Sequence, residues 1–190
     1  MQVLRTERLN LVAAGLTQLD AELESTAALG RVLAAEIPSG WPPGEYDRGA
    51  VEFFRSQLAV NPQAVGWYAW YAVLRGDAAR PAILAGAGGF FGAPDSNGVA
   101  EIGYSIVPEF RVRGLATELV AALVVFALDA PGMRLVVAHT KPENVGSIRV
   151  LERCGFRVVG PGDEPGTVCY VLGSGEIGPL PWRGVRTKSP

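Results

Sequence analysis

A short basic loop, residues 109–114, has a composition that suits the binding of a pyrophosphate. Pro108 ends the strand-like segment before the loop, and an apolar helix-like segment follows it. Such an arrangement presents backbone N–H groups and the positive end of a helix at one point. Arg111 and Arg113 would add charge-assisted hydrogen bonds, and Gly114 would let the backbone approach a phosphate without an intervening Cβ. Neither lysine of the chain stands in a Gly-Lys-Ser/Thr context, which disfavours phosphoryl transfer.

Glu101 is the candidate general base, because of the strand face that it occupies. In a strand over 99–107, the two-residue period places Val99, Glu101, Gly103 and Ser105 on one face and Ala100, Ile102, Tyr104 and Ile106 on the other. Glu101 then projects from a face of small residues, beside which a substrate can lie. The alternative is a solvated carboxylate on an antiparallel strand, since only burial would raise its pKa.

Periodicity and turn residues predict the elements that position these side chains. An apolar period of two predicts strands, and an apolar stripe at helical spacing predicts helices. The predicted strands cover residues 3–13, 67–74, 82–91, 99–107, 134–139, 156–160 and 166–172, and the predicted helices cover 16–37, 47–61, 115–128 and 142–154. The glycines from Gly86 to Gly92 indicate tight strand packing, because Phe91 stands where a dinucleotide fingerprint needs its last glycine.

Arg111-x-x-Gly114-x-Ala116 resembles the Q/R-x-x-G-x-G/A acyl-CoA loop of the GNAT N-acetyltransferases. The residues around it resemble the branch that contains ribosomal-protein N-terminal acetyltransferases of the RimJ/RimL type. This wider resemblance rests on Glu101-Ile102-Gly103-Tyr104, Pro108-Glu109-Phe110-Arg111, Thr117-Glu118, Pro142-Glu143-Asn144, Ser147-Ile148-Arg149-Val150-Leu151-Glu152 and Gly155-Phe156. It implies one acetyltransferase domain over residues 1–172, followed by a C-terminal tail over 173–190.

The resemblance implies an α/β (α+β) fold, with a mixed, mostly antiparallel, splayed sheet of about seven strands and about four helices. Acetyl-CoA would enter between the strand that ends at Val107 and the strand that ends at His139. Its pantetheine arm would pair with backbone near Ile106 and Val107, and its pyrophosphate would lie over residues 111–117. The residues expected to bind acetyl-CoA are Ile106, Val107, Arg111, Val112, Arg113, Gly114, Leu115, Ala116, Thr117, Asn144 and Ser147.

The resemblance also implies a reaction in which a primary amine attacks the thioester of acetyl-CoA directly, within a ternary complex. Glu101 stands where some relatives carry a catalytic glutamate, and Ser147 would lie near the sulfur, so these are the two catalytic candidates. Asn144 would hold the pantetheine or the acceptor. Several relatives carry a tyrosine acid seven residues after this asparagine, where the present chain has Leu151. No general acid can therefore be assigned to that position.

The acceptor amine is left open among a protein N-terminus, an amino acid, a polyamine and an amine-bearing antibiotic. Deprotonating a lysine-like amine at pH 7 costs about 4–5 kcal/mol, whereas a peptide α-amine costs about 1–1.5 kcal/mol, so a weak base suffices for an N-terminus. Trp41 and Glu101 are the candidate substrate-binding residues, because the loop over 38–44 is expected to lie over the acceptor cleft. Nearby acidic residues indicate either a cationic acceptor or a solvated helix face.

Several other polar residues have a structural interpretation beside the functional one. Ser147 near the start of a helix suits capping or packing as well as chemistry. Tyr104, on the predicted core face, suits a packed ring with a bonded hydroxyl. His139 is the only histidine of the chain and could relay protons or be structural. Cys154 and Cys169 suit buried small residues, which gives an acyl-cysteine route little support.

Composition excludes several classes of protein. The 190 residues carry 17 Lys+Arg against 19 Asp+Glu, a balance that disfavours a nucleic-acid-binding domain with a concentrated basic face. Two cysteines and one histidine exclude a disulfide framework and thiolate zinc sites, so no metal is expected. We expect one soluble cytoplasmic domain, because the sequence does not begin with the basic segment and apolar block of a secretion signal. We expect no membrane span, because no run of about 20 apolar residues is present.

The expected partners are acetyl-CoA and an amine acceptor, and a homodimer is left open because Trp182 in the tail could pack on its own domain or on a second copy. The leading hypothesis is an acetyl-CoA-dependent N-acetyltransferase. The alternative is a non-catalytic acyl-CoA-binding module, which the leucine at position 151 motivates.

Overall fold

The structure is a computed structural model that describes residues 1–44, 46–173 and 186–188. Its strands are β1 (Val3–Arg5), β2 (Leu9–Ala13), β3 (Ala69–Leu74), β4 (Ile83–Phe90), β5 (Val99–Ile106), β6 (Leu135–Thr140), β7 (Arg157–Pro161), β8 (Val168–Gly173) and β9 (Arg186–Lys188). Its α-helices are α1 (Leu16–Glu24), α2 (Thr26–Leu33), α3 (Arg48–Val60), α4 (Leu115–Leu128) and α5 (Val145–Arg153), and short 3-10 turns cover Pro62–Ala64 and Pro108–Phe110.

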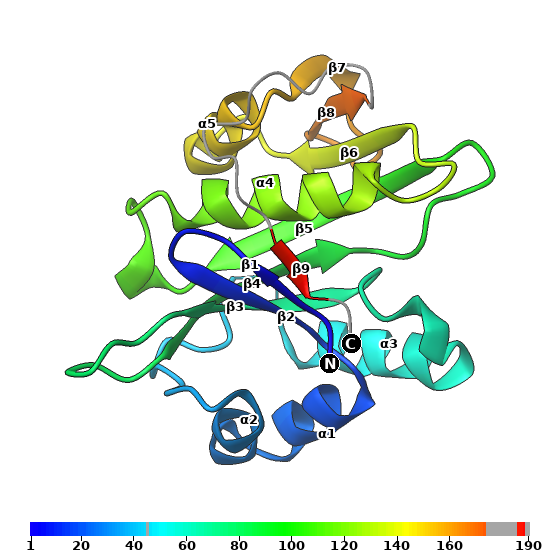
Figure 1. Ribbon diagram of the computed structural model, residues 1–190. Helices are drawn as coiled ribbons and strands as arrows, with labels where there is room; N and C mark the ends of the chain where they lie inside the picture. Colours follow the sequence, from blue (N-terminus) through cyan, green and yellow to red (C-terminus); the bar gives the residue numbers. More distant parts are fainter. Residues whose placement is uncertain (45, 174–185, 189–190) are drawn as a thin grey trace.

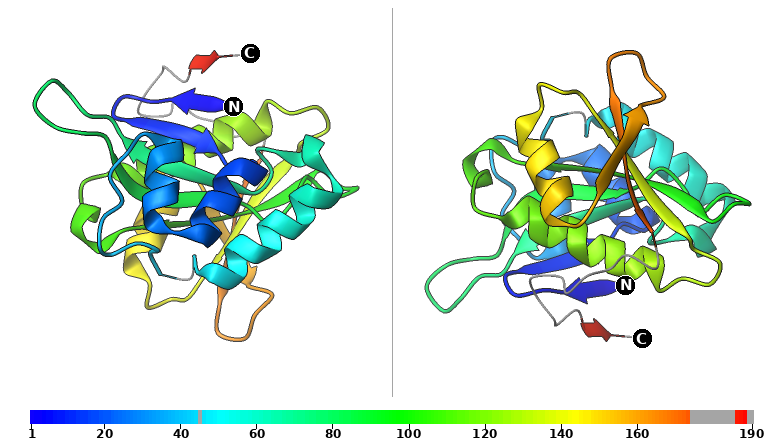
Figure 2. Two further views of the ribbon diagram at one scale, coloured as in Figure 1. Left: turned by 90° about the horizontal axis from the view of Figure 1, so that it is seen from below. Right: turned by 90° about the horizontal axis from the view of Figure 1, so that it is seen from above.

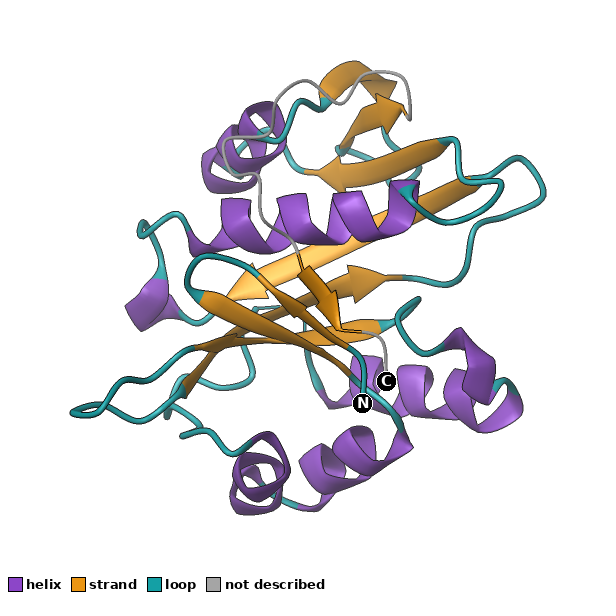
Figure 3. Cartoon of the chain, in the orientation of Figure 1, coloured by secondary structure: helices purple, strands orange, loops and turns teal. Residues whose placement is uncertain are grey.

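The strands form a sheet in the order β7-β8-β6-β5-β4-β3-β2-β1-β9. Helices α1, α2 and α3 cover one face of the sheet, and α4 lies on the other face (Figures 1 and 2). Figure 3 shows the same layers by element type, with α5 next to α4. Strands β5 and β6 pair in parallel, and the other neighbouring strands of the described sheet are antiparallel. The mixed, mostly antiparallel sheet is therefore confirmed.

The sheet is splayed where the parallel strands meet. Register pairs between β5 and β6 run only from Val99 with Leu135 to Glu101 with Val137. The later residues of β5 pair with β4 alone, as Gly86 with Ile106 illustrates. The ends of β5 and β6 are thus separated on the side toward residues 106 and 140, which is the splay that the resemblance implied.

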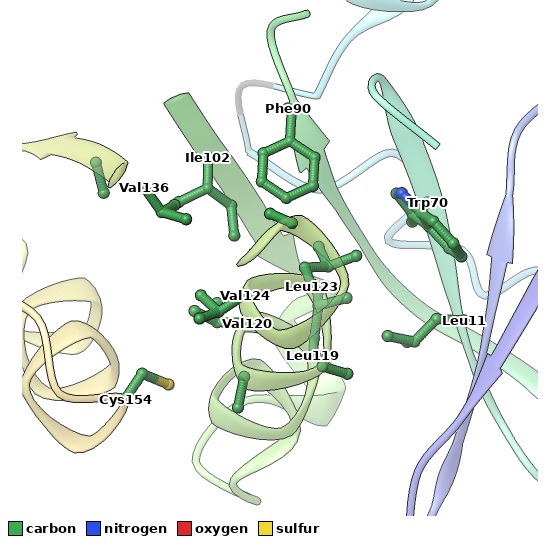
Figure 4. Packing of buried hydrophobic residues seen from close by; sticks show 14 of the residues in the cluster. Leu11, Trp70, Phe90, Ile102, Leu119, Val120, Leu123, Val124, Val136 and Cys154 are labelled. Atoms are coloured by element: carbon green, nitrogen blue, oxygen red, sulfur yellow. The ribbon is translucent and has the colours of Figure 1, made fainter. Parts of the chain in front are cut away.

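Helix α4 fills the space between the two halves of the sheet. Ten of its fourteen residues are buried, because the helix contacts the sheet on one side and α5 on the other. Figure 4 shows Leu119 and Leu123 on the side of Leu11 and Trp70, and Val120 and Val124 on the side of Val136. A helix that is apolar nearly all round fits this enclosed place.

The structure has nine strands and five α-helices within the described residues, against the predicted seven and four. The predicted strand over 3–13 is a hairpin, because the backbone N–H of Thr6 bonds the carbonyl of Leu9 across a turn. The predicted helix over 16–37 is two helices, because Ser25 is extended and its side chain caps α2 through the N–H of Ala28. Strand β9 lies within the predicted tail and pairs with β1, whereas Trp182 lies outside the described residues.

The glycine run does pack tightly. A Cβ on Gly89 would lie 1.8 Å from the carbonyl oxygen of Tyr68, and one on Gly86 would lie 2.5 Å from that of Ser105. Strands β3, β4 and β5 therefore approach each other closely at these positions. Among the described helices, none is both long and apolar enough to cross a bilayer.

Candidate acyl-CoA and amine site

The loop between β5 and α4 forms one wall of the splay. The 3-10 turn Pro108–Phe110 follows β5, and the chain then passes through Val112 at φ 59° and Gly114 at φ 76° before α4 begins at Leu115. Positive φ is rare for a β-branched residue, and such outliers concentrate at ligand sites. No described side chain caps the helix at Gly114, so its first N–H groups stay available to an anion.

The two loop arginines are both held by neighbours. Arg111 donates from Nε to the carbonyl of Ile106 at 3.0 Å, at the strand end expected to meet the pantetheine. Arg113 lies over the ring of Phe110, with its guanidinium carbon 5.5 Å from the ring centroid. These contacts restrict the two side chains, so less rotamer entropy remains to be lost if the loop binds a ligand.

Glu101 and His139 lie together on the face of the sheet away from α4. Oε1 of Glu101 is 3.2 Å from Nδ1 of His139, and the side chains are 36% and 14% exposed. Val137 pairs with Glu101, and His139 lies two residues further along β6 on the same face. The predicted strand face of Glu101 is confirmed. The pairing with His139 was missed, because the two residues are 38 positions apart and only strand register brings them together.

Ser147 and Tyr104 connect β5 to α5 across the splay. The two hydroxyl oxygens are 2.8 Å apart, and burial raises the pKa of Tyr104 well above its ordinary value. The expectation of a packed tyrosine with a bonded hydroxyl is confirmed. Asn144 caps α5 by accepting from the N–H of Ser147 at 3.1 Å, so its carboxamide oxygen already has a structural task. Leu151 is fully buried and offers no proton donor.

Trp41 is anchored to a carboxylate of α1. Its Nε1 donates to Glu22 at 2.8 Å, and the hydroxyls of Tyr46 and Tyr71 donate to the same carboxylate at 2.8 and 2.6 Å. Burial raises the pKa of Glu22, and the three hydrogen bonds only partly offset it. Trp41 is 8% exposed, so its ring holds the loop in place and gives an acceptor little surface. Contact between this ring and a substrate stays a prediction.

The loop held by Glu22 lies against the end of β5. A Cβ on Gly44 would lie 2.8 Å from Oγ of Ser105, and one on Gly40 would lie 3.1 Å from Cγ1 of Val107. The loop over 38–44 is therefore close to the strand end at which the thioester is expected. That the loop covers an acceptor stays a prediction. Sequence reasoning missed its anchor, because a glutamate on a helix carries no local signal of such a partner.

Glu118 is a further residue that sequence reasoning did not assign. It lies in the first turn of α4, and its side chain is 4% exposed. Its partner Arg8 comes from the turn between β1 and β2, at a distance of 2.7 Å. A carboxylate in an otherwise apolar helix is a signal in itself, since a buried charge needs a partner.

The fold and this site define a class of acyl-CoA-dependent transferase, and comparison with known proteins names the family. A family model described as an acetyltransferase (GNAT) domain matches residues 13–157. The uncharacterized N-acetyltransferase YjdG of Bacillus subtilis is 30% identical over 156 residues, which cover 82% of this chain and 90% of YjdG. The chain belongs to the GNAT family of acetyltransferases and is an N-acetyltransferase by class.

Solved structures share the fold. A GNAT-family acetyltransferase from Bacillus anthracis superposes with a TM-score of 0.61 at 21% identity, covering 92% of this chain and 99% of that one. Mycobacterium smegmatis RimJ, solved in complex with CoA-disulfide, gives a TM-score of 0.61 at 19% identity, covering 95% and 88%. At these identities the likeness concerns the fold alone.

The family uses acetyl-CoA, and the residues at the splay fit it. Gly114 puts no Cβ between the backbone and a phosphate, and the uncapped start of α4 offers N–H donors. Two arginines of the same loop supply positive charge. Within the described residues, no three His, Cys, Asp or Glu side chains are grouped so as to hold a metal ion.

Proposed function

We propose that this enzyme transfers the acetyl group of acetyl-CoA to a primary amine by direct attack in a ternary complex. The observation that carries the proposal is the splay beyond the Glu101–Val137 pair, with the uncapped N-terminus of α4 on one side and the Glu101–His139 pair on the other. The donor and the acceptor then approach the same gap from opposite faces of the sheet.

Residues 111–117 bind the pyrophosphate in this proposal, and the backbone of Ile106 and Val107 meets the pantetheine. The carbonyl of Ile106 already accepts from Arg111, but a carbonyl oxygen has two lone pairs and can accept a second hydrogen bond. Asn144 and Ser147, at the start of α5, line the other side of the arm. The N–H of Val107 already donates to the carbonyl of Ala85 at 2.9 Å, so the oxyanion would be met by another backbone N–H near this strand end.

Glu101 acts as the general base, and His139 orients its carboxylate. The amine nitrogen attacks the thioester carbon, the new C–N bond forms, and the C–S bond breaks to release the CoA thiolate. The proton lost by the amine passes to Glu101. The thiolate takes up a proton from solvent, either directly or through the Ser147 hydroxyl, which regains a proton from solvent in the same step. The hydroxyl of Tyr104 orients Ser147, since the two oxygens lie 2.8 Å apart.

A peptide α-amine is the acceptor that this machinery suits best. A carboxylate is a weak base, and an α-amine needs less deprotonation than a lysine side chain. The residues around the loop resemble the branch that contains ribosomal-protein N-terminal acetyltransferases, which supports the same choice. A small-molecule amine is the second candidate, and a panel of free and blocked amines separates them.

The donor half of the proposal is tested by titration with acetyl-CoA. Thermal-shift titration should give a saturable rise in Tm with acetyl-CoA and a much smaller one with ADP, because a ligand at a hundredfold excess over Kd stabilises by about 2.7 kcal/mol. Arg113→Glu should weaken binding at least about tenfold, since it places a negative charge at the phosphates. Unchanged affinity in this variant would contradict the loop assignment.

A further inference from the structure

Glu118 in α4 collects hydrogen bonds from the turn between β1 and β2. It accepts from Oγ1 of Thr6 at 2.5 Å, from the N–H and Nε of Arg8 at 2.7 Å each, and from the N–H of Leu9 at 3.2 Å. Burial alone would raise the pKa of Glu118, but these hydrogen bonds and the charge of Arg8 hold it below its usual value. The carboxylate is therefore ionised and fixes the Arg8 side chain.

Arg8 extends from this carboxylate to the loop that precedes α4. While its Nε bonds Glu118, its Nη1 donates to the carbonyl of Arg113 at 2.7 Å. Its Nη2 lies 3.4 Å from the point where a Cβ on Gly114 would stand, and it has no hydrogen-bond partner among the residues that the structure describes. The side chain is 42% exposed, so the free end of the guanidinium reaches the surface beside the loop.

The contact with the Arg113 carbonyl orients the next peptide group. In a planar trans peptide the C=O and the following N–H point in opposite directions. When Arg8 holds the carbonyl of Arg113 toward the hairpin, the N–H of Gly114 is directed away from the hairpin. The same contact places Nη2 of Arg8, which donates to no described residue, and the positive charge of the guanidinium at the start of α4.

We propose that Arg8 is a positioning residue for the acyl-CoA loop, held by Glu118 and acting on the Arg113–Gly114 peptide. This inference rests on the proposed function of residues 111–117 as the pyrophosphate site. Arg8 lies about 100 residues earlier in the chain than the loop motif, in a hairpin that otherwise contributes strands to the sheet. The N-terminal hairpin would thereby contribute directly to CoA affinity.

A purely structural role for Arg8 makes a different prediction, and Arg75 provides the matched control. Nη1 of Arg75 donates to the carbonyls of Thr6 and Leu9 at 2.8 and 2.9 Å, and its Nη2 contacts the carbonyl of Glu7. Arg75 thus supports the same turn as Arg8 but has no contact with residues 111–114 in the described structure. A variant at Arg75 loosens the hairpin and leaves the Arg113 carbonyl untouched.

The test measures CoA binding by isothermal titration calorimetry in the wild type, Arg8→Gln, Arg8→Lys and Arg75→Gln, with a melting curve for each. We expect Arg8→Gln to raise the Kd for CoA about 10- to 100-fold, the range for losing a hydrogen bond to a charged group. Arg8→Lys should raise the Kd for CoA nearly as much, because the ammonium group of lysine cannot bond Glu118 and the Arg113 carbonyl in one plane. The Kd of Arg75→Gln for CoA should stay within about threefold of the wild-type value, even if its Tm falls as much as that of Arg8→Gln.

A second readout separates loop positioning from general damage. Acetyl-pantetheine carries the thioester without the pyrophosphate, so Arg8→Gln should lower kcat/KM for acetyl-CoA more than for acetyl-pantetheine. Equal losses for the two donors, an unchanged Kd in Arg8→Gln, or a matching loss in Arg75→Gln would overturn the proposal. Because calorimetry needs no acceptor, a wild type that binds CoA but transfers no acetyl group would contradict the proposed function alone.

Discussion

At the scale of single residues, the contact between Glu101 and His139 supports the proposed role of Glu101 as the group that takes the proton of the amine. A glutamate alone at a strand edge can adopt several rotamers, whereas a hydrogen bond to an imidazole restricts it to one. The exposed fraction of 36% at Glu101 leaves room for an amine beside the carboxylate. His139 is partly buried and adjoins Gly162, where a Cβ would lie 3.1 Å from its ring, so the imidazole is itself held in place.

Replacing the carboxylate should separate catalysis from donor binding. We expect Glu101→Gln to lower kcat about a hundredfold, as for loss of a general base, and to leave the Kd for CoA unchanged. The acid limb of the pH–rate profile, which reports deprotonation of the base, should disappear. Steady-state rates across pH and calorimetry with CoA check both statements.

Glu52→Gln is the control for this variant, because it removes the same charge from an exposed position on α3, outside the loops that border the splay. It should keep the wild-type profile. If Glu101→Gln retained the wild-type kcat and the same acid limb, the base would have to be another group.

At the scale of elements, a half-buried and a buried carboxylate hold the two loops that border the splay. Glu22 on α1 holds the loop over 38–44, and Glu118 on α4 holds Arg8 and through it the loop over 111–114. Their environments differ in charge. The donors to Glu22 are neutral, whereas Glu118 has a guanidinium as partner. The pKa of Glu22 is raised, and the pKa of Glu118 is lowered.

These opposite shifts predict opposite pH dependences of stability. The pKa of Glu22 is raised in the folded state, so its contribution is complete at low pH and is lost as pH rises through the folded pKa. The pKa of Glu118 is lowered, so its contribution is complete at neutral pH and is lost as pH falls through the folded pKa.

Urea denaturation from about pH 2.5 to about pH 7 measures both effects as differences in the free energy of unfolding from the wild type. The range extends below the ordinary Glu pKa of about 4.3, because the pKa of Glu118 is lowered. The destabilisation caused by Glu118→Gln should shrink as pH falls, and that caused by Glu22→Gln should grow. Each variant serves as the control for the other, because both make the same chemical change. Parallel trends in the two variants would refute the charge assignments.

The elements near the site were predictable from sequence because their signals are local. Helix α4 was predicted with the bounds that the structure shows, since its apolar run begins after Gly114. Strand β5 was predicted to within one residue, since Pro108 cannot continue the ladder. The N-terminal segment was predicted less well, because the break between β1 and β2 depends on Glu118, more than a hundred residues away.

At the scale of the whole molecule, the splayed sheet connects distant segments to one reaction. The parallel β5–β6 pair opens after three register pairs, and α4 packs into both halves and keeps them apart. In the proposed function, the loop over 111–117 and the Glu101–His139 pair lie on the two sides of this gap. The loop motif was readable in the sequence, whereas the Glu101–His139 and Arg8–Arg113 contacts were not, because strand register and helix packing create them.

The most direct test of this account is an initial-velocity matrix with acetyl-CoA and a peptide that carries a free α-amine, read as release of the CoA thiol. Direct attack in a ternary complex predicts turnover that needs both substrates and double-reciprocal lines that intersect. The same peptide with a blocked α-amine should give no release. Parallel lines would contradict direct attack by indicating an acyl-enzyme, and absence of thiol release with every primary amine tried, despite acetyl-CoA binding, would contradict the central claim of acetyl transfer.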